Sequence, residues 1–237
     1  IRGFTAAGIN IFEGYGMTES SPGGTLNDLR NNSLKIGTVG KPLDGIEVKI
    51  ADDGEILMKG DNVMLGYYKN EEMTNKTIID GYLHTGDIGE IDKQGFLTIT
   101  DRKKEIFKTS GGKYIAPAAL ESELKQSRFI EQVMVIGEGE KMPAALIQPN
   151  FSFIEEWAER HEYKITDVTT DEQIISRIQK EIDFHNQKFG KWEQIKKFEI
   201  TPDEWSIEAG HLTPTMKMKR KVIKEKYKNL HQKIYNS

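Results

Sequence analysis

The segment GYGMTES, which begins at Gly14, brings a ring, a hydroxyl and a carboxylate close together in the chain. Its glycines let the backbone approach a ligand closely, and Tyr15 offers a ring on which a flat base can stack. Thr18 can donate to a phosphate, and Glu19 can bind Mg²⁺, which prefers carboxylate oxygens. The spacing alone favours a plainer alternative, a tight turn with a packed Tyr15 and an exposed Glu19.

A second candidate is the run His84-Thr85-Gly86-Asp87, where a carboxylate follows a glycine turn. An aspartate in this setting can accept hydrogen bonds from both hydroxyls of a ribose. The alternative is an aspartate that caps a turn with its own side chain. The spacing leaves both interpretations open.

The run KTSGGK at residues 108–113 invites comparison with a phosphate-binding Walker A loop. The comparison fails, because Phe107 stands where a glycine is needed and Tyr114 stands where Ser or Thr would bind Mg²⁺. Two alternatives remain for this segment. It is either a flexible glycine loop that approaches a ligand or a plain connection from a strand to a helix that begins near Pro117.

A basic segment lies near the end of the chain, with a single acid, Glu225, among its cations. The cations of residues 217–228 are Lys217, Lys219, Arg220, Lys221, Lys224, Lys226 and Lys228. Such a helix can contact nucleic acid or anionic lipid, although a solvated helix face is the commoner explanation. The formal net charge of −4 gives no general reason to expect a nucleic-acid partner.

The elements that must position these residues differ between the two halves of the chain. Residues 1–100 read as short strands divided by turns, beginning with strand-like sequence over the first sixteen residues and including a short helical stretch near Glu71–Ile78. Asp53-Gly54 is the strongest hairpin signal. Strands at this spacing predict a small β-barrel or curled sheet.

Residues 101–237 show an α+β pattern, so the fold class expected for the whole chain is α+β. Apolar spacing predicts helices over 117–127, 151–162, 171–189 and 219–234, and strands over 130–137, 143–148 and 196–201. Residues 1–100 hold 15 acids and 9 bases, and the remainder holds 22 acids and 24 bases. This shift predicts two domains, 1–100 and 101–237, with a boundary at Asp101.

Composition excludes several classes of site within the chain. There is no cysteine, which excludes a disulfide scaffold, a thiol nucleophile and a zinc site with cysteine ligands. The five histidines show no metal-ligand spacing, and no apolar run approaches the length of a membrane span. A chain without cysteine is compatible with the cytosol. Because the sequence opens without an initiator methionine in strand-like residues, we expect a fragment of a longer protein.

Taken in order, the motifs resemble those of adenylate-forming (AMP-binding) enzymes, the superfamily of acyl-CoA synthetases, luciferases and peptide-synthetase adenylation domains. The segments that carry the resemblance are GYGMTES, GEILMKGDNVMLGYY, YLHTGD, GFLTITDRKKEIFKTSGGKYIAP and LTPTMKMKRKVI. The last one departs from the PKTxSGK pattern of most members and looks like the long-chain fatty acid–CoA ligases. The resemblance covers nearly the whole chain.

The resemblance implies a ligase that works in two steps. ATP and a fatty acid give an acyl-adenylate and pyrophosphate with Mg²⁺ as cofactor, and the thiol of coenzyme A then displaces AMP. Tyr15 would stack near adenine with Gly16 beside it, and Thr18 would contact the α-phosphate. Glu19 would hold Mg²⁺, and Asp87 would bind the ribose hydroxyls.

The resemblance also assigns roles to residues in the second half. Arg102 would add a ribose or phosphate contact, and Lys217 would approach the carboxylate and α-phosphate in the first step. In this family the C-terminal domain rotates between the two steps. Asp101 matches the hinge, and Gly111 and Gly112 match the loop that lies against the pantetheine arm in the second step.

The resemblance further implies that this chain is the C-terminal portion of such an enzyme. The family's upstream phosphate loop and much of its acyl tunnel are absent, so we expect the chain alone to be inactive and to need the missing N-terminal portion. A cytoplasmic location is expected, and peripheral membrane association stays open, as do acyl chain length and oligomeric state. Two alternatives are transfer to a carrier protein and a non-enzymatic interaction module with a basic tail.

Overall fold

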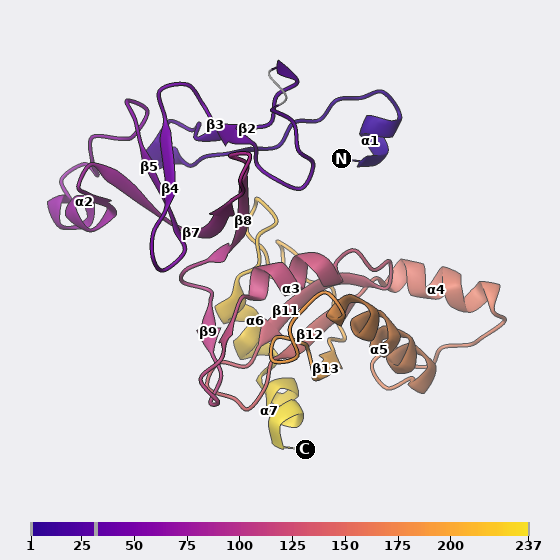
Figure 1. The fold of residues 1–237 in the computed structure, drawn as a ribbon. Coiled ribbons are helices and arrows are strands. Elements are labelled where there is room, and N and C mark those ends of the chain that lie inside the picture. The colour runs from indigo at the N-terminus through magenta and orange to yellow at the C-terminus, as the bar shows by residue number, and fades with distance from the viewer. Residues whose placement is uncertain (1, 31–32, 237) are drawn as a thin grey trace. The chain divides into compact units, whose positions relative to one another are not determined.

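The structure is a computed structural model that describes residues 2–30 and 33–236. The chain divides into two compact units, Ile1–Lys104 and Glu105–Ser237 (Figure 1). The boundary predicted at Asp101 lies shortly before this division, inside a strand of the first unit.

The first unit is built from two antiparallel sheets. The smaller sheet has the order β1-β2-β3, from Gly14–Tyr15, Thr25–Leu26 and Lys41–Pro42. The larger sheet has the order β4-β5-β7-β6, with β8 also paired to β7. Its strands are β4 (Glu47–Ile50), β5 (Glu55–Lys59), β6 (Ile78–Ile79), β7 (Tyr82–Ile91) and β8 (Leu97–Arg102). Strand β7 therefore pairs with three other strands of this sheet, β5, β6 and β8.

The curled-sheet alternative describes this unit better than a barrel. Among residues 2–30 and 33–104, neither sheet closes on itself. The predicted hairpin at Asp53-Gly54 is confirmed, since it joins β4 to β5 and Gly54 has a φ of +85°. The core of the unit consists of the buried residues Ile56, Met58, Leu83 and Leu97.

The strand-like interpretation of the N-terminus is wrong for most of the segment. Helix α1 (Arg2–Ala6) occupies its start, and only Gly14–Tyr15 forms a strand. The amide of Ala7 donates to the carbonyl oxygens of Gly3 and Phe4. The backbone of this segment thus forms helical hydrogen bonds instead of pairing with a strand. The other helices of this unit are the 3₁₀ turn η1 (Thr18–Ser20) and α2 (Glu71–Thr77).

The second unit has a mixed sheet with helices on both faces, which confirms the α+β class. Strand β11 (Ile130–Ile136) pairs antiparallel with β12 (Ala144–Pro149), which pairs parallel with β13 (Lys197–Ile200). A separate hairpin joins β9 (Phe107–Lys108) to β10 (Tyr114–Ile115). The helices are α3 (Pro117–Leu124), α4 (Phe151–Arg160), α5 (Glu172–Asn186), α6 (Arg220–Lys226) and α7 (Lys228–Asn236).

Side chains alternate along β11 between two buried clusters, because successive residues of a strand point to opposite faces. Val133 and Val135 join the cluster that contains residues of α3, α4 and α5. Met134 and Ile136 join a cluster that contains residues of α6 and α7. The sheet is therefore the middle layer of three, as Figure 1 lets the reader follow.

The helix predicted over 219–234 is interrupted. Helices α6 and α7 are separated at Tyr227, which has φ −103° and ψ 31°. The buried ring of Tyr227 stacks on Trp205 with a centroid distance of 6.3 Å, and its hydroxyl lies 3.3 Å from Oδ2 of Asp203. This tertiary packing holds the chain out of helical geometry.

No helix in the described ranges is long and apolar enough to cross a membrane.

Candidate functional site

The buried carboxylate of Asp87 contacts two residues from other parts of the sequence, Tyr15 and Arg102. The hydroxyl of Tyr15 donates to Oδ2 of Asp87 at 2.6 Å, and Nε of Arg102 lies 3.1 Å from Oδ1. Strand pairing explains the second contact, because Asp87 on β7 stands opposite Arg102 on β8. Three of the predicted site residues thus meet in one place.

This arrangement leaves Asp87 able to accept further hydrogen bonds. Burial raises the pKa of Tyr15, and the bond to Asp87 raises it further, so Tyr15 remains a hydroxyl donor. Each carboxylate oxygen carries two acceptor positions. The contacts with Tyr15 and Arg102 use one position of each oxygen, so each oxygen has one acceptor position left.

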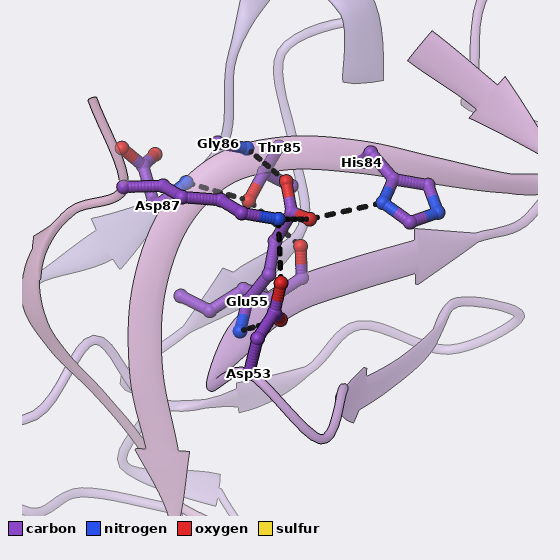
Figure 2. Close-up of polar contacts among 8 residues, drawn as sticks. Asp53, Glu55, His84, Thr85, Gly86 and Asp87 are labelled. Carbon is purple, nitrogen blue, oxygen red and sulfur yellow. Dashed lines mark hydrogen bonds and ion pairs between the residues drawn. The ribbon is translucent and has the colours of Figure 1, made fainter. Parts of the chain in front are cut away.

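A second carboxylate, that of Glu55, fixes the turn before Asp87 (Figure 2). Its Oε1 accepts the amide of Gly86 at 2.8 Å, and its Oε2 accepts Nζ of Lys103 at 2.8 Å. Nδ1 of His84 lies 3.0 Å from the same Oε2. Gly86 has a φ of +73°, a left-handed geometry that favours glycine. Glu55 therefore sets the path of β7 into Asp87.

The environment of Glu55 keeps it ionised. Burial alone would raise its pKa, but the ammonium of Lys103, together with His84 and the Gly86 amide, holds the pKa below its ordinary value. Glu55 is not among the site residues predicted from the sequence. The available signal was an acid inside an apolar strand, since a buried acid is almost always paired.

The GYGMTES turn is held by close backbone packing. A Cβ atom on Gly16 would lie 1.5 Å from the carbonyl oxygen of Pro22, so no other residue fits there. The side-chain amide of Asn62 donates to the carbonyl oxygens of Ser20 at 3.0 Å and Gly23 at 2.6 Å. These contacts fix the turn that carries Thr18.

Glu19 is oriented by two contacts from one segment. The hydroxyl of Tyr67 donates to its Oε1 at 2.8 Å, and the amide of Met64 donates to its carbonyl oxygen at 2.9 Å. Thr18 next to it is exposed. Thr18 and Glu19 were predicted from the sequence, but neither of the residues that hold Glu19 in place was.

The donor set fits a loosely held Mg²⁺ rather than a closed metal site. In the part of the chain that the structure describes, no group of three or more histidine or acidic residues could hold a metal. Mg²⁺ usually keeps several waters and takes one or two carboxylates with substrate phosphates. The single carboxylate of Glu19 is compatible with that mode.

Lys217 lies in the second unit, at the end of a tight loop. The amide of Thr213 donates to the carbonyl oxygen of Lys217 at 2.8 Å, and the amide of Lys217 donates to Oγ1 of Thr213 at 3.1 Å. Met216 has a φ of +60°, and Leu212 and Met218 bridge the base of the loop. The loop is thus locally ordered while the Lys217 side chain stays exposed.

An ion-pair cluster anchors the helix that follows this loop. Nη2 of Arg220 lies 2.5 Å from Oε1 of the buried Glu121, and its Nε lies 3.1 Å from Oε2 of Glu105. The amide of Val135 also donates to Oε1 of Glu121 at 2.7 Å. Arg220 therefore ties α6 to α3 and β11.

Burial has different net effects on the pKa values of Glu121 and Arg220. Burial raises the pKa of Glu121 to about 7, which outweighs its attraction to Arg220. Burial would lower the pKa of Arg220, but Glu121 and Glu105 together raise it above its ordinary value. The arginine therefore keeps its charge, and the Glu121 carboxyl changes charge near neutral pH.

The KTSGGK segment is a hairpin rather than a plain connection from a strand to a helix. It joins β9 to β10, and the amide of Thr109 donates to the carbonyl oxygen of Lys113 at 2.9 Å. Gly111 and Gly112 are exposed at its tip, and Gly112 has a φ of +78°. Both glycines belong to the second unit, as does Lys217.

Comparison with protein-family models gives two matches. A model described as AMP-binding enzyme matches residues 1–68, and one described as AMP-binding enzyme C-terminal domain matches residues 104–237. The second match covers more than half of the chain.

Curated relatives align along nearly the whole chain. Long-chain-fatty-acid–CoA ligase FadD15 of Mycobacterium bovis is 43% identical over 237 residues, which is 98% of this chain and 39% of that protein. Fatty acyl-CoA synthetase B of Dictyostelium discoideum is 32% identical over 244 residues, which is 95% of this chain and 36% of that protein. The chain thus spans well under half the length of these relatives.

Solved structures share the fold. O-succinylbenzoate CoA synthetase from Bacillus subtilis, in complex with its acyl-adenylate intermediate, aligns with a TM-score of 0.71 at 25% identity over 94% of this chain and 43% of that one. The same enzyme with ATP and magnesium gives a TM-score of 0.65 at 25% identity over 85% and 40%. The adenylation domain of a carboxylate reductase from Mycobacterium chelonae gives 0.77 at 19% identity over 100% and 36%, a likeness of fold alone.

Proposed function

The chain belongs to the family of AMP-binding enzymes, and on that premise we propose that it is the C-terminal part of a long-chain fatty acid–CoA ligase. The reaction would begin when a carboxylate oxygen of the fatty acid attacks the α-phosphorus of ATP and pyrophosphate leaves. The sulfur of coenzyme A would then attack the acyl carbon, AMP would leave, and the thiol proton would pass to solvent. The buried Asp87 between Tyr15 and Arg102 is the observation that carries this proposal.

We assign nucleotide binding to the first unit. Asp87 would accept the two ribose hydroxyls, because each of its oxygens has an acceptor position beyond the one that Tyr15 or Arg102 uses. Arg102 would add a ribose or phosphate contact from β8. Tyr15 is partly buried against the core of the unit and would stack near adenine, while Gly16 would keep the backbone close to the ligand.

We assign phosphate and metal contacts to the same turn. Thr18 would contact the α-phosphate, and Glu19 would hold Mg²⁺. A bound Mg²⁺ neutralises phosphate charge in reactions of this type. Tyr67 would keep the Glu19 carboxylate in a fixed direction.

The second unit would supply groups for both steps. Lys217 would stabilise negative charge that develops at the α-phosphate, where a preorganised cation is worth several kcal/mol. Gly111 and Gly112 would lie against the pantetheine arm in the second step. We propose that the unit turns between the steps about a hinge near Asp101, since a few residues can absorb such a rotation.

The proposal has consequences for the setting of the enzyme. The chain covers only 39% of a relative named as a ligase, so activity would need the rest of the protein. ATP, a fatty acid and coenzyme A would be its small-molecule partners. A cytoplasmic location with peripheral membrane contact is part of the proposal, because acyl chains partition into bilayers.

Pyrophosphate exchange into ATP in the full-length protein tests this function. Exchange should depend on added long-chain carboxylate, and Asp87→Ala should lower kcat/KM for ATP about a hundredfold, as expected for losing two charge-assisted hydrogen bonds. Asp52→Ala, which removes an exposed aspartate from the β4–β5 turn, is the control and should change little. Exchange that needs no carboxylate, or that survives loss of Asp87, would exclude the proposal.

The acceptor is tested separately. Coenzyme A and an acyl carrier protein are offered in turn to the full-length protein loaded with acyl-adenylate. We expect thioester formation with coenzyme A, and preference for the carrier protein would favour the alternative of an adenylation enzyme that loads a carrier.

A further inference from the structure

A groove with a volume of about 470 Å³ runs along one face of the C-terminal helices, α6 and α7, which are coloured yellow in Figure 1. Lys221, Lys224 and Lys228 line it at intervals of three and four residues, and His231 and Tyr235 continue the same spacing. Lys221 and Lys224 lie on one side of α6, and Lys228 is the first residue of α7, after the break at Tyr227. The groove therefore gathers cations from two consecutive helices.

The three lysines differ from their neighbours in their partners. Lys226 pairs with Asp203 at 2.9 Å and Lys233 pairs with Glu199 at 2.8 Å. Within residues 2–30 and 33–236, none of the three groove lysines has an ion pair. The groove also contains two carboxylates, Glu140 and Glu225, and neither neutralises the lysines by direct contact.

The three groove lysines are like charges that line one groove, and all three are exposed. Lys221 and Lys224 are like charges three residues apart on α6, and such a pair weakens a helix by a small amount. An anion placed among them would remove this repulsion and gain the attraction of several cations at once. The arrangement is thus complementary to a ligand with more than one negative charge.

The opposite wall of the groove is connected to the KTSGGK hairpin. The hydroxyl of Tyr235 lies 3.0 Å from the carbonyl oxygen of Met142, which holds α7 against the loop after β11. The carbonyl oxygen of Glu140 in that loop accepts the amide of Ser110 at 2.8 Å, and the amide of Gly139 donates to the carbonyl oxygen of Lys108 at 2.9 Å. One loop therefore contacts the hairpin on one side and borders the groove on the other.

We propose that this groove binds the phosphate groups of a small polyanionic ligand through Lys221, Lys224 and Lys228. Its volume falls within the range of small-molecule sites. The nucleotide end of coenzyme A has the required chemistry, and this identification rests on the proposed function, in which the adjoining hairpin meets the pantetheine arm. The binding of phosphate groups as such does not depend on the proposed function.

Adenosine 3′,5′-bisphosphate is the probe, titrated calorimetrically into the full-length protein in the presence of saturating AMP. The test variant is Lys224→Gln/Lys228→Gln. The control is Lys226→Gln/Lys233→Gln, which removes the same charge from lysines outside the groove. We expect about a tenfold loss of affinity in the test variant, as for two partly exposed ion pairs, and less than a twofold change in the control. The affinity of the wild-type protein should fall as salt is added.

The following outcomes separate the interpretations. The KM for coenzyme A should rise in the test variant by more than the KM for 3′-dephospho-coenzyme A. Equal affinity of the test and control variants for the probe would overturn the proposal that the groove binds phosphate groups. Lysine-dependent binding to phosphatidylglycerol vesicles, with none to the probe, would assign the lysines to a lipid headgroup and overturn the small-molecule site. Probe binding that depends on the lysines in a protein without ligase activity would keep the groove and reject coenzyme A as its ligand.

Discussion

Tyr67 orients the carboxylate of Glu19, although the two residues are distant in the sequence. The phenol donates to Oε1, and the same bond raises the pKa of Tyr67, so the donor stays protonated. A hydrogen bond to a charged group is worth about 1.5–3 kcal/mol. Tyr67 should therefore strongly affect the affinity of Glu19 for a bound cation.

Replacing Tyr67 by phenylalanine should weaken the response of the full-length enzyme to Mg²⁺. The carboxylate would lose its orienting donor, so we expect the Mg²⁺ concentration for half-maximal pyrophosphate exchange to rise about five- to tenfold. The measurement is a Mg²⁺ titration at saturating ATP.

Tyr68→Phe provides the matched control, because the Tyr68 side chain is 87% exposed and next in sequence. It should leave the Mg²⁺ titration unchanged. An equal shift in both variants, or none in either, would show that Tyr67 does not act through Glu19.

Residues identified from the sequence were those that lie in ordered motifs. Tyr15, Asp87 and Arg102 were assigned from motif order; strand pairing places Arg102 opposite Asp87, and the Tyr15 hydroxyl donates to Asp87. Glu55 and Asn62 were missed, because their roles depend on contacts with residues about thirty or more positions away. Apolar periodicity contains no information about such partners.

At the scale of elements, α3, β11 and α6 meet at Glu121. Its carboxyl has a pKa of about 7, above the ordinary 4.5, so the folded state favours the protonated form. The stability that this proton confers is present below about pH 4.5 and is lost as the pH rises through 7. The second unit should therefore lose stability across that window.

Glu121→Gln should remove this part of the pH dependence. Between pH 5 and pH 8 the free energy of unfolding of the wild-type protein should fall by on the order of 2 kcal/mol more than that of the variant. Urea unfolding monitored by tryptophan fluorescence measures it, since the tryptophans Trp157, Trp192 and Trp205 all lie in the second unit.

Glu138→Gln is the control for this comparison, because Glu138 is exposed in the loop after β11. Its pH dependence should match the wild-type protein. A Glu121→Gln variant with the wild-type slope would mean that Glu121 is ionised throughout the range and that Arg220 outweighs burial.

Elements were predictable where local signals determine them. The β4–β5 hairpin follows from Asp53-Gly54, and α5 begins where Asp171 caps it by accepting the amides of Gln173 and Ile174. The break at Tyr227 was not predictable, because it depends on stacking against Trp205. Nor was α1, which forms where apolar residues alone suggested a strand.

At the scale of the whole molecule, the division of labour follows the two units. The first unit contains the carboxylate site around Asp87 and the turn with Glu19, and the second contains Lys217, the glycine hairpin and the lysine groove. If the proposed function holds, each step of the reaction would draw different groups from the second unit. A substitution there should therefore affect one step more than the other.

Lys217→Ala in the full-length protein tests the central proposal most directly, with pyrophosphate exchange and thioester formation from preformed acyl-adenylate measured separately. Lys219→Ala is the control, because it removes a similar exposed charge two residues away. We predict that Lys217→Ala lowers exchange at least a hundredfold while transfer to coenzyme A stays within a few-fold of wild type. Exchange that persists without Lys217 would contradict the proposal, as would equal loss of both steps.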